Sequence, residues 1–430
     1  MLRSHRVSAW SMGSTRRRYL GAVRRYCVSV VVWALSLALP AAVAFQMGTG
    51  RDVSPVSLEG NADVDVKSAI QRSVGYLVQA CSPRGRFAYL VDIKDGSVSR
   101  SYNIVRHAGA IYSLAMYNRF HPDARVVDTM ARAAAFMRTV YMSREPRSNE
   151  LVVWSKAVGF TAKAELGGSG LGLVALTEVA RARPGSISVG DLQSLGRSVL
   201  SMQRPDGSFF SRYVAGVGPV GEGESLYYPG EAALGLIDFY EVDHSRQWLD
   251  AAAKGLSYLA KSRHGLQEIP DDHWALIATA KLLTHYDRAA SPASREELIQ
   301  HVRVICEAML SEQVTTSDEP MLIGGFTLDG RTTPTATRLE GLMAAWEFLP
   351  RGEAALRARI ESSAKLGVAF LLRAEIVSGP FAGGMPAVIP RGTSVVMRDV
   401  ERESEVRIDY VQHALCAWLR VATQCGSIRT

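Results

Sequence analysis

Two features are scarce in this sequence of 430 residues: cysteines at metal-binding spacing, and long apolar runs beyond the N-terminal segment. Five cysteines are present without a Cys-x-x-Cys pair, which disfavours a structural zinc site. After about residue 45, no stretch is long and apolar enough to span a bilayer. Alternating runs rich in β-branched residues are short and few, so the sequence does not favour a sheet-based fold.

An excess of positive charge is also missing once the N-terminal segment is set aside. The net charge is +7, but residues 1–44 contain seven arginines and no lysine or acidic residue. Removing these seven from the 49 basic residues leaves 42, which equals the number of acidic residues. Nucleic acids and anionic membranes select clustered positive charge, so neither is an expected partner of the remaining chain.

Residues 1–44 have the order of an export signal. Arginines come first, an apolar run covers 28–39, and Ala42-Val43-Ala44 forms a small-x-small cleavage signal before Phe45. The arginines at 16–18 also fit a twin-arginine signal, and an uncleaved membrane anchor is a third interpretation. We expect a periplasmic or secreted protein with a linker over 45–61 and one domain over 62–430. Any membrane contact is expected only through an uncleaved N-terminus.

Four cysteines lie outside the N-terminal segment, at positions 81, 306, 416 and 425. An exported protein can form disulfides, but the spacing of these residues does not reveal which of them pair.

From about residue 62, helical periodicity dominates, and two kinds of helix alternate. The first kind has an apolar stripe and a charged face, as in 245–261, where Leu249, Leu256 and Leu259 share one side. The six segments of this kind are 63–81, 125–141, 189–202, 245–261, 294–310 and 353–372. The second kind begins with a polar cluster and is then apolar on nearly every side, which is typical of a buried helix. These six begin near residues 106, 163, 227, 271, 335 and 407.

Six alternating pairs predict an all-α fold, a closed (α/α)6 barrel (a six-hairpin toroid) with short β-hairpin loops. One acidic or histidine residue marks the start of each buried helix: His107, Glu165, Glu231, Asp272, Glu340 and Asp409. Repetition at intervals of tens of residues indicates stacked units, and closing the ring removes the exposed ends of a solenoid. An open helical solenoid is the alternative fold.

The polar clusters all lie at the N-terminal ends of the buried helices. Parallel inner helices would bring the six clusters, and six positive helix ends, to one mouth of the barrel. Buried polar groups are costly unless they are paired or wet, so we expect a polar funnel that binds a ligand. For a single residue, a cap or a structural ion pair remains an equally simple interpretation.

Carboxylates in this funnel suggest glycoside hydrolysis, which needs one as acid and another as base or nucleophile. The candidate catalytic residues are Asp272, Glu231 and Asp409. The other candidates would bind substrate through aromatic faces or charged groups: Arg106, His107, Lys163, Glu165, Tyr227, Tyr228, His273, Trp274, Arg338, Glu340, Arg407 and Tyr410. We interpret His413 as a core residue, and 214–226, with Glu222 and Glu224, as a surface loop rather than a lid.

The stretches Arg106-His107-Ala-Gly, Tyr227-Tyr228-Pro-Gly-Glu231, Asp271-Asp272-His273-Trp274 and Arg407-Ile-Asp409-Tyr410-Val-Gln-His413 carry a resemblance. The chain resembles the six-hairpin glycosidase-like superfamily over nearly all of residues 62–430. The last stretch is similar to the helical domain of D-glucuronyl C5-epimerases. The resemblance implies an (α/α)6 barrel and carbohydrate chemistry, but it transfers no catalytic residue.

The sequence therefore favours an exported glycoside hydrolase that acts on a poly- or oligosaccharide and uses no cofactor. A uronate lyase or C5-epimerase is the first alternative, because arginine and tyrosine clusters suit proton removal next to a carboxylate. A non-catalytic barrel that binds a glycan or an envelope partner is the second. A terpene cyclase is disfavoured because no Asp-rich motif is present, and a zinc site would rest only on the spacing of His413 and Cys416.

Overall fold

The computed structural model describes residues 62–159, 163–221, 225–390 and 403–424. All of these belong to one compact unit, Leu58–Thr430. The predicted signal and linker, together with Glu222, Glu224 and Cys425, lie outside the described residues. In the described part, Cys81, Cys306 and Cys416 are free thiols, and no helix has the length and apolar character needed to cross a membrane.

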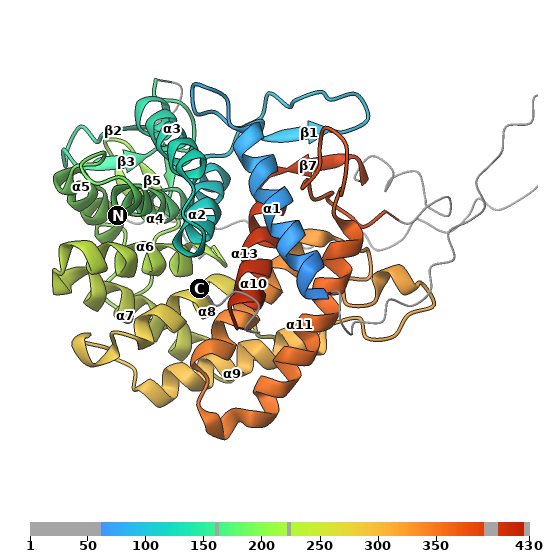
Figure 1. Ribbon diagram of the computed structural model, residues 1–430. Coiled ribbons are helices and arrows are strands. Elements are labelled where there is room, and N and C mark those ends of the chain that lie inside the picture. The colour runs from blue at the N-terminus through green and yellow to red at the C-terminus, as the bar shows by residue number, and fades with distance from the viewer. Residues whose placement is uncertain (1–61, 160–162, 222–224, 391–402, 425–430) are drawn as a thin grey trace, which may run out of the picture. The chain divides into compact units, whose positions relative to one another are not determined.

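In the described residues, twelve α-helices form six outer–inner pairs, as the sequence predicts. Figure 1 shows how they are arranged. The outer helices are α1 (Ala62–Ala80), α3 (Ala124–Tyr141), α5 (Val189–Leu200), α7 (Arg246–Ser262), α9 (Arg295–Ser311) and α11 (Ala354–Ala374). The inner helices are α2 (Ile104–Phe120), α4 (Leu166–Ala182), α6 (Tyr228–Asp243), α8 (His273–Leu283), α10 (Thr332–Phe348) and α13 (Ile408–Gln424). All twelve predicted helices are therefore confirmed, and their observed ends differ from the predicted ones by a few residues.

The inner helices close into a ring, which confirms the barrel over the open solenoid. Each inner helix packs against the next in the order α2, α4, α6, α8, α10 and α13, and α13 packs back onto α2. Glycine permits the close approach of α4 and α6, because a Cβ on Gly235 would lie 2.5 Å from the carbonyl oxygen of Gly170. An apolar residue at such a position would force these two backbones apart.

The outer helices bury one stripe and leave the other face wet. On α7, Leu249, Leu256 and Leu259 are at most 1% exposed, while Lys254 is partly exposed and Lys261 is exposed. The inner helix α6 is instead buried almost continuously from Pro229 to Tyr240. These two burial patterns follow the two hydrophobic patterns in the sequence.

The loops that lead into the inner helices contain short antiparallel sheets. Strand β1 (Leu90–Asp92) pairs with β7 (Glu405–Arg407), with Leu90 opposite Arg407, and β7 runs directly into α13. Strand β4 (Lys163–Glu165) runs into α4 and pairs with β5 (Arg212–Val214), which pairs with β6 (Gly218–Val220). A hairpin joins β2 (Met142–Arg144) to β3 (Leu151–Val153). Three 3₁₀ turns complete the described elements: η1 (Tyr286–Arg288), η2 (Pro320–Leu322) and η3 (Arg351–Glu353).

Candidate active site

A cavity of about 660 Å³ lies at the N-terminal ends of the inner helices. Ten of the fifteen candidate side chains line it: Arg106, Tyr227, Tyr228, Glu231, His273, Trp274, Arg338, Arg407, Asp409 and Tyr410. The expected convergence of the helix starts is therefore present. The other five candidates, His107, Lys163, Glu165, Asp272 and Glu340, are not among the lining residues.

Asp409, at the start of α13, forms ion pairs with two arginines. Its Oδ2 lies 3.0 Å from Nε of Arg106, and Arg407 binds it through two bonds of 2.6 and 3.0 Å. Arg407 also lies over the ring of Tyr410, at 4.3 Å from the ring centroid. Bidentate arginine pairing fixes the orientation of the carboxylate as well as its charge.

Glu231, on α6, is a buried carboxyl group in the cavity wall. It is 4% exposed, and no described residue forms a hydrogen bond with its Oε2. Burial, reinforced by the negative charges of Asp272 and Glu165, raises the pKa of Glu231 to about 8. At neutral pH this group is therefore mostly a protonated acid, able to donate a proton.

Asp272 has a structural place that the sequence did not reveal. Its side chain accepts a hydrogen bond of 3.0 Å from the Ala275 amide, which caps α8, and it pairs with Arg263 at 2.8 Å. It is fully buried, and burial raises the pKa of its carboxyl group despite the arginine. The catalytic role predicted for Asp272 has no geometric support, whereas the next residue, His273, does line the cavity.

Three further candidates, His107, Lys163 and Glu165, do not line the cavity. His107 bridges the hydroxyl group of Tyr102 at 2.7 Å and the carbonyl oxygen of Ala133 at 2.9 Å, and burial lowers its pKa to about 4. It thus ties α2 to α3 as a neutral imidazole. Lys163 is exposed on β4. Glu165 occupies the N-cap position of α4, but its side chain forms no capping hydrogen bond. Its charge helps to raise the pKa values of Tyr228 and Glu231.

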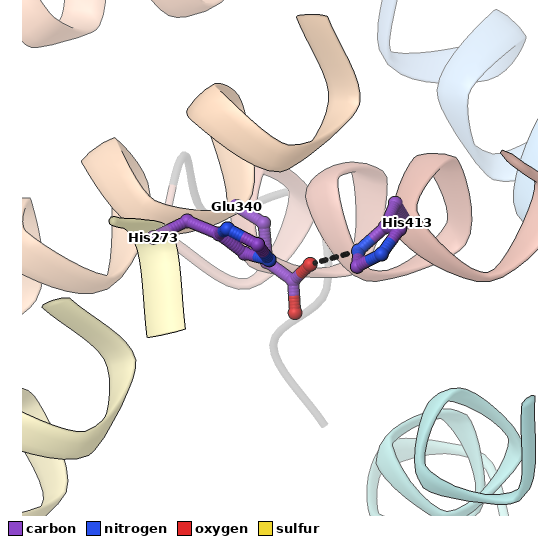
Figure 2. A group of neighbouring side chains, drawn as sticks. All are labelled: His273, Glu340 and His413. Atoms are coloured by element: carbon purple, nitrogen blue, oxygen red, sulfur yellow. Dashed lines mark hydrogen bonds and ion pairs between the residues drawn. The ribbon is translucent and has the colours of Figure 1, made fainter. Parts of the chain in front are cut away.

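Three side chains from different inner helices meet at the inner part of the site (Figure 2): His273 of α8, Glu340 of α10 and His413 of α13. Nδ1 of His413 lies 2.9 Å from Oε2 of Glu340, and the two imidazole rings are 5.3 Å apart between centroids. All three residues are buried, and both histidines line the cavity. Burial, with the nearby His413, lowers the pKa of His273 well below its usual value.

The tautomer of His413 follows from its partner. The amide nitrogen of Gln412 also lies 3.2 Å from Nδ1, but a carboxylate only accepts hydrogen bonds. The shorter contact with Glu340 therefore assigns a proton to Nδ1, and Nε2 is the nitrogen available to a molecule in the cavity. This arrangement is that of a carboxylate-oriented histidine base.

His413 and Gln412 were not among the sequence candidates, although both line the cavity. The interpretation of His413 as a core residue rested on its apolar neighbours. A signal was available, because residues four apart on a helix share a face and Asp409 was already placed in the funnel.

The comparisons with known proteins establish the fold. No protein-family profile and no curated protein sequence matches the chain. The solved structure of a D-mannose isomerase superposes with a TM-score of 0.61 at 10% identity, over 85% of this chain and 99% of that chain. A sugar epimerase from a ruminal bacterium gives 0.61 at 8% identity, over 84% and 98%. An α-mannanase from Bacteroides thetaiotaomicron gives 0.57 at 11% identity, over 85% and 99%.

These neighbours have the (α/α)6 barrel of the six-hairpin glycosidase-like superfamily, which confirms the resemblance at the level of fold. They are hydrolases, epimerases, isomerases and lyases that act on carbohydrates, and they include an unsaturated glucuronyl hydrolase and a polysaccharide lyase. At such low identity, the fold is what is shared.

Proposed function

We propose that this protein is a carbohydrate-active enzyme that moves a proton on a sugar carbon next to a carbonyl group, as an epimerase or isomerase. The observation that carries the proposal is the Glu340–His413 pair, with His273 beside it in the wall of a sugar-sized cavity. The sequence favoured hydrolysis because it drew attention to carboxylates. The geometry instead supports imidazoles as the proton carriers.

His413 is the proposed general base. Glu340 accepts a hydrogen bond from Nδ1, which fixes the ring and stabilises the imidazolium that forms when Nε2 takes a proton. Glu340 is fully buried, so its carboxylate is shielded from competing water. It acts through His413, and is therefore a positioning residue.

The reaction balances within the sugar. His413 takes the proton from the carbon next to the carbonyl group, the C–H electrons form a carbon–carbon double bond, and the carbonyl oxygen receives a proton. Glu231 lines the same cavity and is mostly protonated at neutral pH, so it can supply that proton. Returning a proton to carbon regenerates a carbonyl group, and no oxidant or reductant is required.

The presence of a second histidine, His273, determines which product the enzyme can form. If the proton returns to the neighbouring carbon, one base is sufficient and the product is the ketose or aldose isomer. If it returns to the original carbon from the other face, a second base is needed and the product is an epimer. His273 lines the cavity, and no described residue forms a hydrogen bond with its ring nitrogens, so it is the candidate for that second base.

Carbohydrate isomerases and epimerases among the solved structures of this fold support the proposed class of reaction. They include a D-mannose isomerase, a sugar epimerase and two cellobiose 2-epimerases. Their likeness covers at least 84% of this chain.

Glycoside hydrolysis is the second candidate, and one observation favours it. Glu231 is a protonated carboxyl group in the cavity, as a general acid must be, and Asp409 is an arginine-paired carboxylate in the same wall. The α-mannanase and the glucuronyl hydrolase show that this fold accommodates hydrolysis. In this reaction Glu231 and Asp409 would be essential, while His413 would not carry a proton.

The test is incubation of the purified protein with reducing sugars in D₂O, followed by NMR. The panel includes D-mannose, cellobiose and uronic acids, with methyl glycosides as controls that cannot open to a carbonyl form. We expect deuterium next to the carbonyl carbon of one sugar, with its epimer or isomer, and no exchange in the glycosides. New reducing ends without deuterium would favour the hydrolase. Binding without any conversion would favour a glycan-binding barrel.

Export is part of the proposal and rests on residues 1–44. The arginines, the apolar run and the Ala42-Val43-Ala44 site support removal of the segment before Phe45. We expect N-terminal sequencing of the protein from a bacterial periplasm or medium to begin at Phe45. An intact Met1 in the membrane fraction would favour the uncleaved anchor.

A further inference from the structure

The cluster of His273, Glu340 and His413 has the chemistry of a metal site as well as that of a base. One ligand atom from each residue can be chosen so that all three lie within 4.8 Å of one another. The three residues come from three inner helices, α8, α10 and α13 (Figure 2). They are 1%, 0% and 9% exposed, so they form a mostly dehydrated set of donors.

Part of the cluster's bonding capacity is unused by the described residues. Oε1 of Glu340 and both ring nitrogens of His273 are buried, and no described residue forms a hydrogen bond with them. Several buried lone pairs therefore converge on one point, an arrangement that is costly unless a cation or a donor completes it.

We propose that His273, Glu340 and His413 bind a divalent transition-metal ion of the zinc type, and that the bound ion blocks the enzyme. Two imidazoles and one carboxylate suit zinc, whereas magnesium and calcium prefer oxygen ligands. The binding site stands on the geometry alone. The blocking effect rests on the proposed function, because an ion bound to Nδ1 of His413 leaves the ring proton on Nε2, the atom that must accept the proton from the sugar.

To complete the metal site, the side chain of His273 must make a small movement. In a tetrahedral zinc site the ligand atoms lie about 3.3 Å apart. Nδ1 of His413 and Oε2 of Glu340 already approach to 2.9 Å, so an ion bound by these atoms would replace the proton between them, and His273 must move closer. Its ring is held by packing against Tyr227 and Trp274, with centroids 5.0 Å away in both cases. Since no described residue forms a hydrogen bond with it, a rotation breaks none of the described bonds.

The cavity supplies the remaining coordination position. Both histidines line the cavity, so an ion between them would keep one side open to water or to a sugar hydroxyl group. Three protein ligands with one open position are typical of an exchangeable zinc site rather than of a closed structural one. We therefore expect reversible binding that a chelator removes.

The test is calorimetric titration of the purified, chelator-treated protein with Zn²⁺ in the absence of sugar. We expect one ion per chain, and an affinity that falls by more than about 10-fold in His273→Ala and in Glu340→Gln. Glu340→Gln preserves the side-chain shape, so it tests the ligand charge without opening a cavity. His264→Ala, which removes an exposed histidine, is the matched control and should bind like the wild type. Equal affinity in all variants, or no binding, would overturn the proposal.

The two proposals fail separately. Zinc binding without turnover of any sugar would leave the metal site standing and remove the epimerase or isomerase. Turnover of a sugar without zinc binding would support the epimerase or isomerase and remove the metal site. If both occur, we expect Zn²⁺ to suppress deuterium exchange and a chelator to restore it, while a metal-dependent increase in turnover would overturn the blocking effect.

Discussion

The two ends of the inner helices are both rich in buried ionisable groups, but the two ends differ in how many of these groups form ion pairs. Toward the C-terminal ends, Lys281 pairs with Asp238 and, at 3.0 Å, with Glu241. Arg181 pairs with Glu178 and, at 2.9 Å, with Glu241, and Arg119 joins Glu178. At the far end Asp238 has one buried oxygen, Oδ2, without a hydrogen-bond partner among the described residues, but it keeps its ion pair with Lys281. At the mouth, by contrast, Glu231 and His273 have no charged partner among the described residues and also have buried polar atoms that form no hydrogen bond with them.

This difference in pairing indicates that the far end stabilises the fold, whereas the mouth is suited to binding a ligand. Positive side chains at helix C-termini complement the helix dipoles, and mutual pairing offsets part of the cost of burying them. The far end thus closes its own network and needs no ligand. The unpaired groups at the mouth cost stability in the free protein, a cost that a functional site can sustain when a substrate or ion completes it.

The sharpest test of this comparison is the loss of the proposed base. We expect His413→Asn to lower the rate of deuterium exchange by about 1,000-fold, on the order of 4 kcal/mol in barrier, with little change in stability. The control is His301→Asn, which removes another buried histidine, on α9 and outside the cavity lining. A similar loss of activity per folded molecule in both variants would mean that the effect is structural.

At the far end, the expected effect is on stability. Asp238 is 1% exposed, and removing its charge leaves Lys281 with only Glu241. Breaking a buried pair costs 3–5 kcal/mol, so we expect Asp238→Asn to lower the free energy of unfolding in urea by about 3 kcal/mol. Zinc affinity and turnover per folded molecule should not change.

The matched control for that variant is Glu361→Gln, which breaks a surface pair with Lys365 at 3.6 Å. Both side chains are largely exposed, so its effect should stay below about 1 kcal/mol. Equal losses in Asp238→Asn and Glu361→Gln would show that the far-end network does not carry stability.

A smaller effect is expected when the histidine loses its orienting partner. Glu340→Gln retains the shape but weakens the charge-assisted bond to His413. We expect turnover to fall by about 10- to 100-fold, as for other residues that orient a reactive group. The apparent pKa of the turnover rate should also fall, because the imidazolium loses a stabilising negative charge. A pH profile unchanged from that of the wild type would remove Glu340 from the mechanism.

The smallest effect concerns pH and Glu231. Its pKa is about 8 in the folded protein and near 4.5 when unfolded, so the folded state binds the extra proton between these values. This group therefore stabilises the protein fully below about pH 4.5, and its contribution is lost as the pH rises through 8. We expect Glu231→Gln, which mimics the protonated acid, to gain at least about 1 kcal/mol over the wild type at pH 8 relative to pH 5. Urea unfolding at both pH values measures this, and parallel curves would contradict it.

Most of the fold could be predicted from the sequence because the hydrophobic pattern is regular. The stripe of α7 and the all-round burial of α6 identify outer and inner helices without ambiguity. Six inner helices with polar starts then predict the barrel and its cavity. The sheet of β1 with β7 has three residues per strand and joins segments that are far apart in the sequence, so no local pattern identifies it. The β2–β3 hairpin, by contrast, belongs to the short β-hairpin loops that the sequence predicts.

The roles of individual site residues could be predicted less well. In the run from Asp271 to Trp274, consecutive side chains at a helix start point in different directions. Asp271 turns to Arg338, Asp272 caps α8, and His273 faces the cavity. Only the geometry of the cap decides among them. The meeting of Glu340 with His413 depends on how α10 and α13 pack, which the sequence of either helix alone does not contain.

The last inner helix closes the ring, and this sets the order in which the protein can become active during folding. Contacts across the closure join distant parts of the chain: Arg420 reaches Tyr112, 308 positions away, and Arg72 reaches Glu375, 303 positions away. Such contacts form slowly, since a long loop must be closed before they contribute. Helix α13 also carries Asp409 and His413. A folding intermediate that has not yet docked α13 would be largely helical yet inactive, so in refolding experiments activity should return later than helicity.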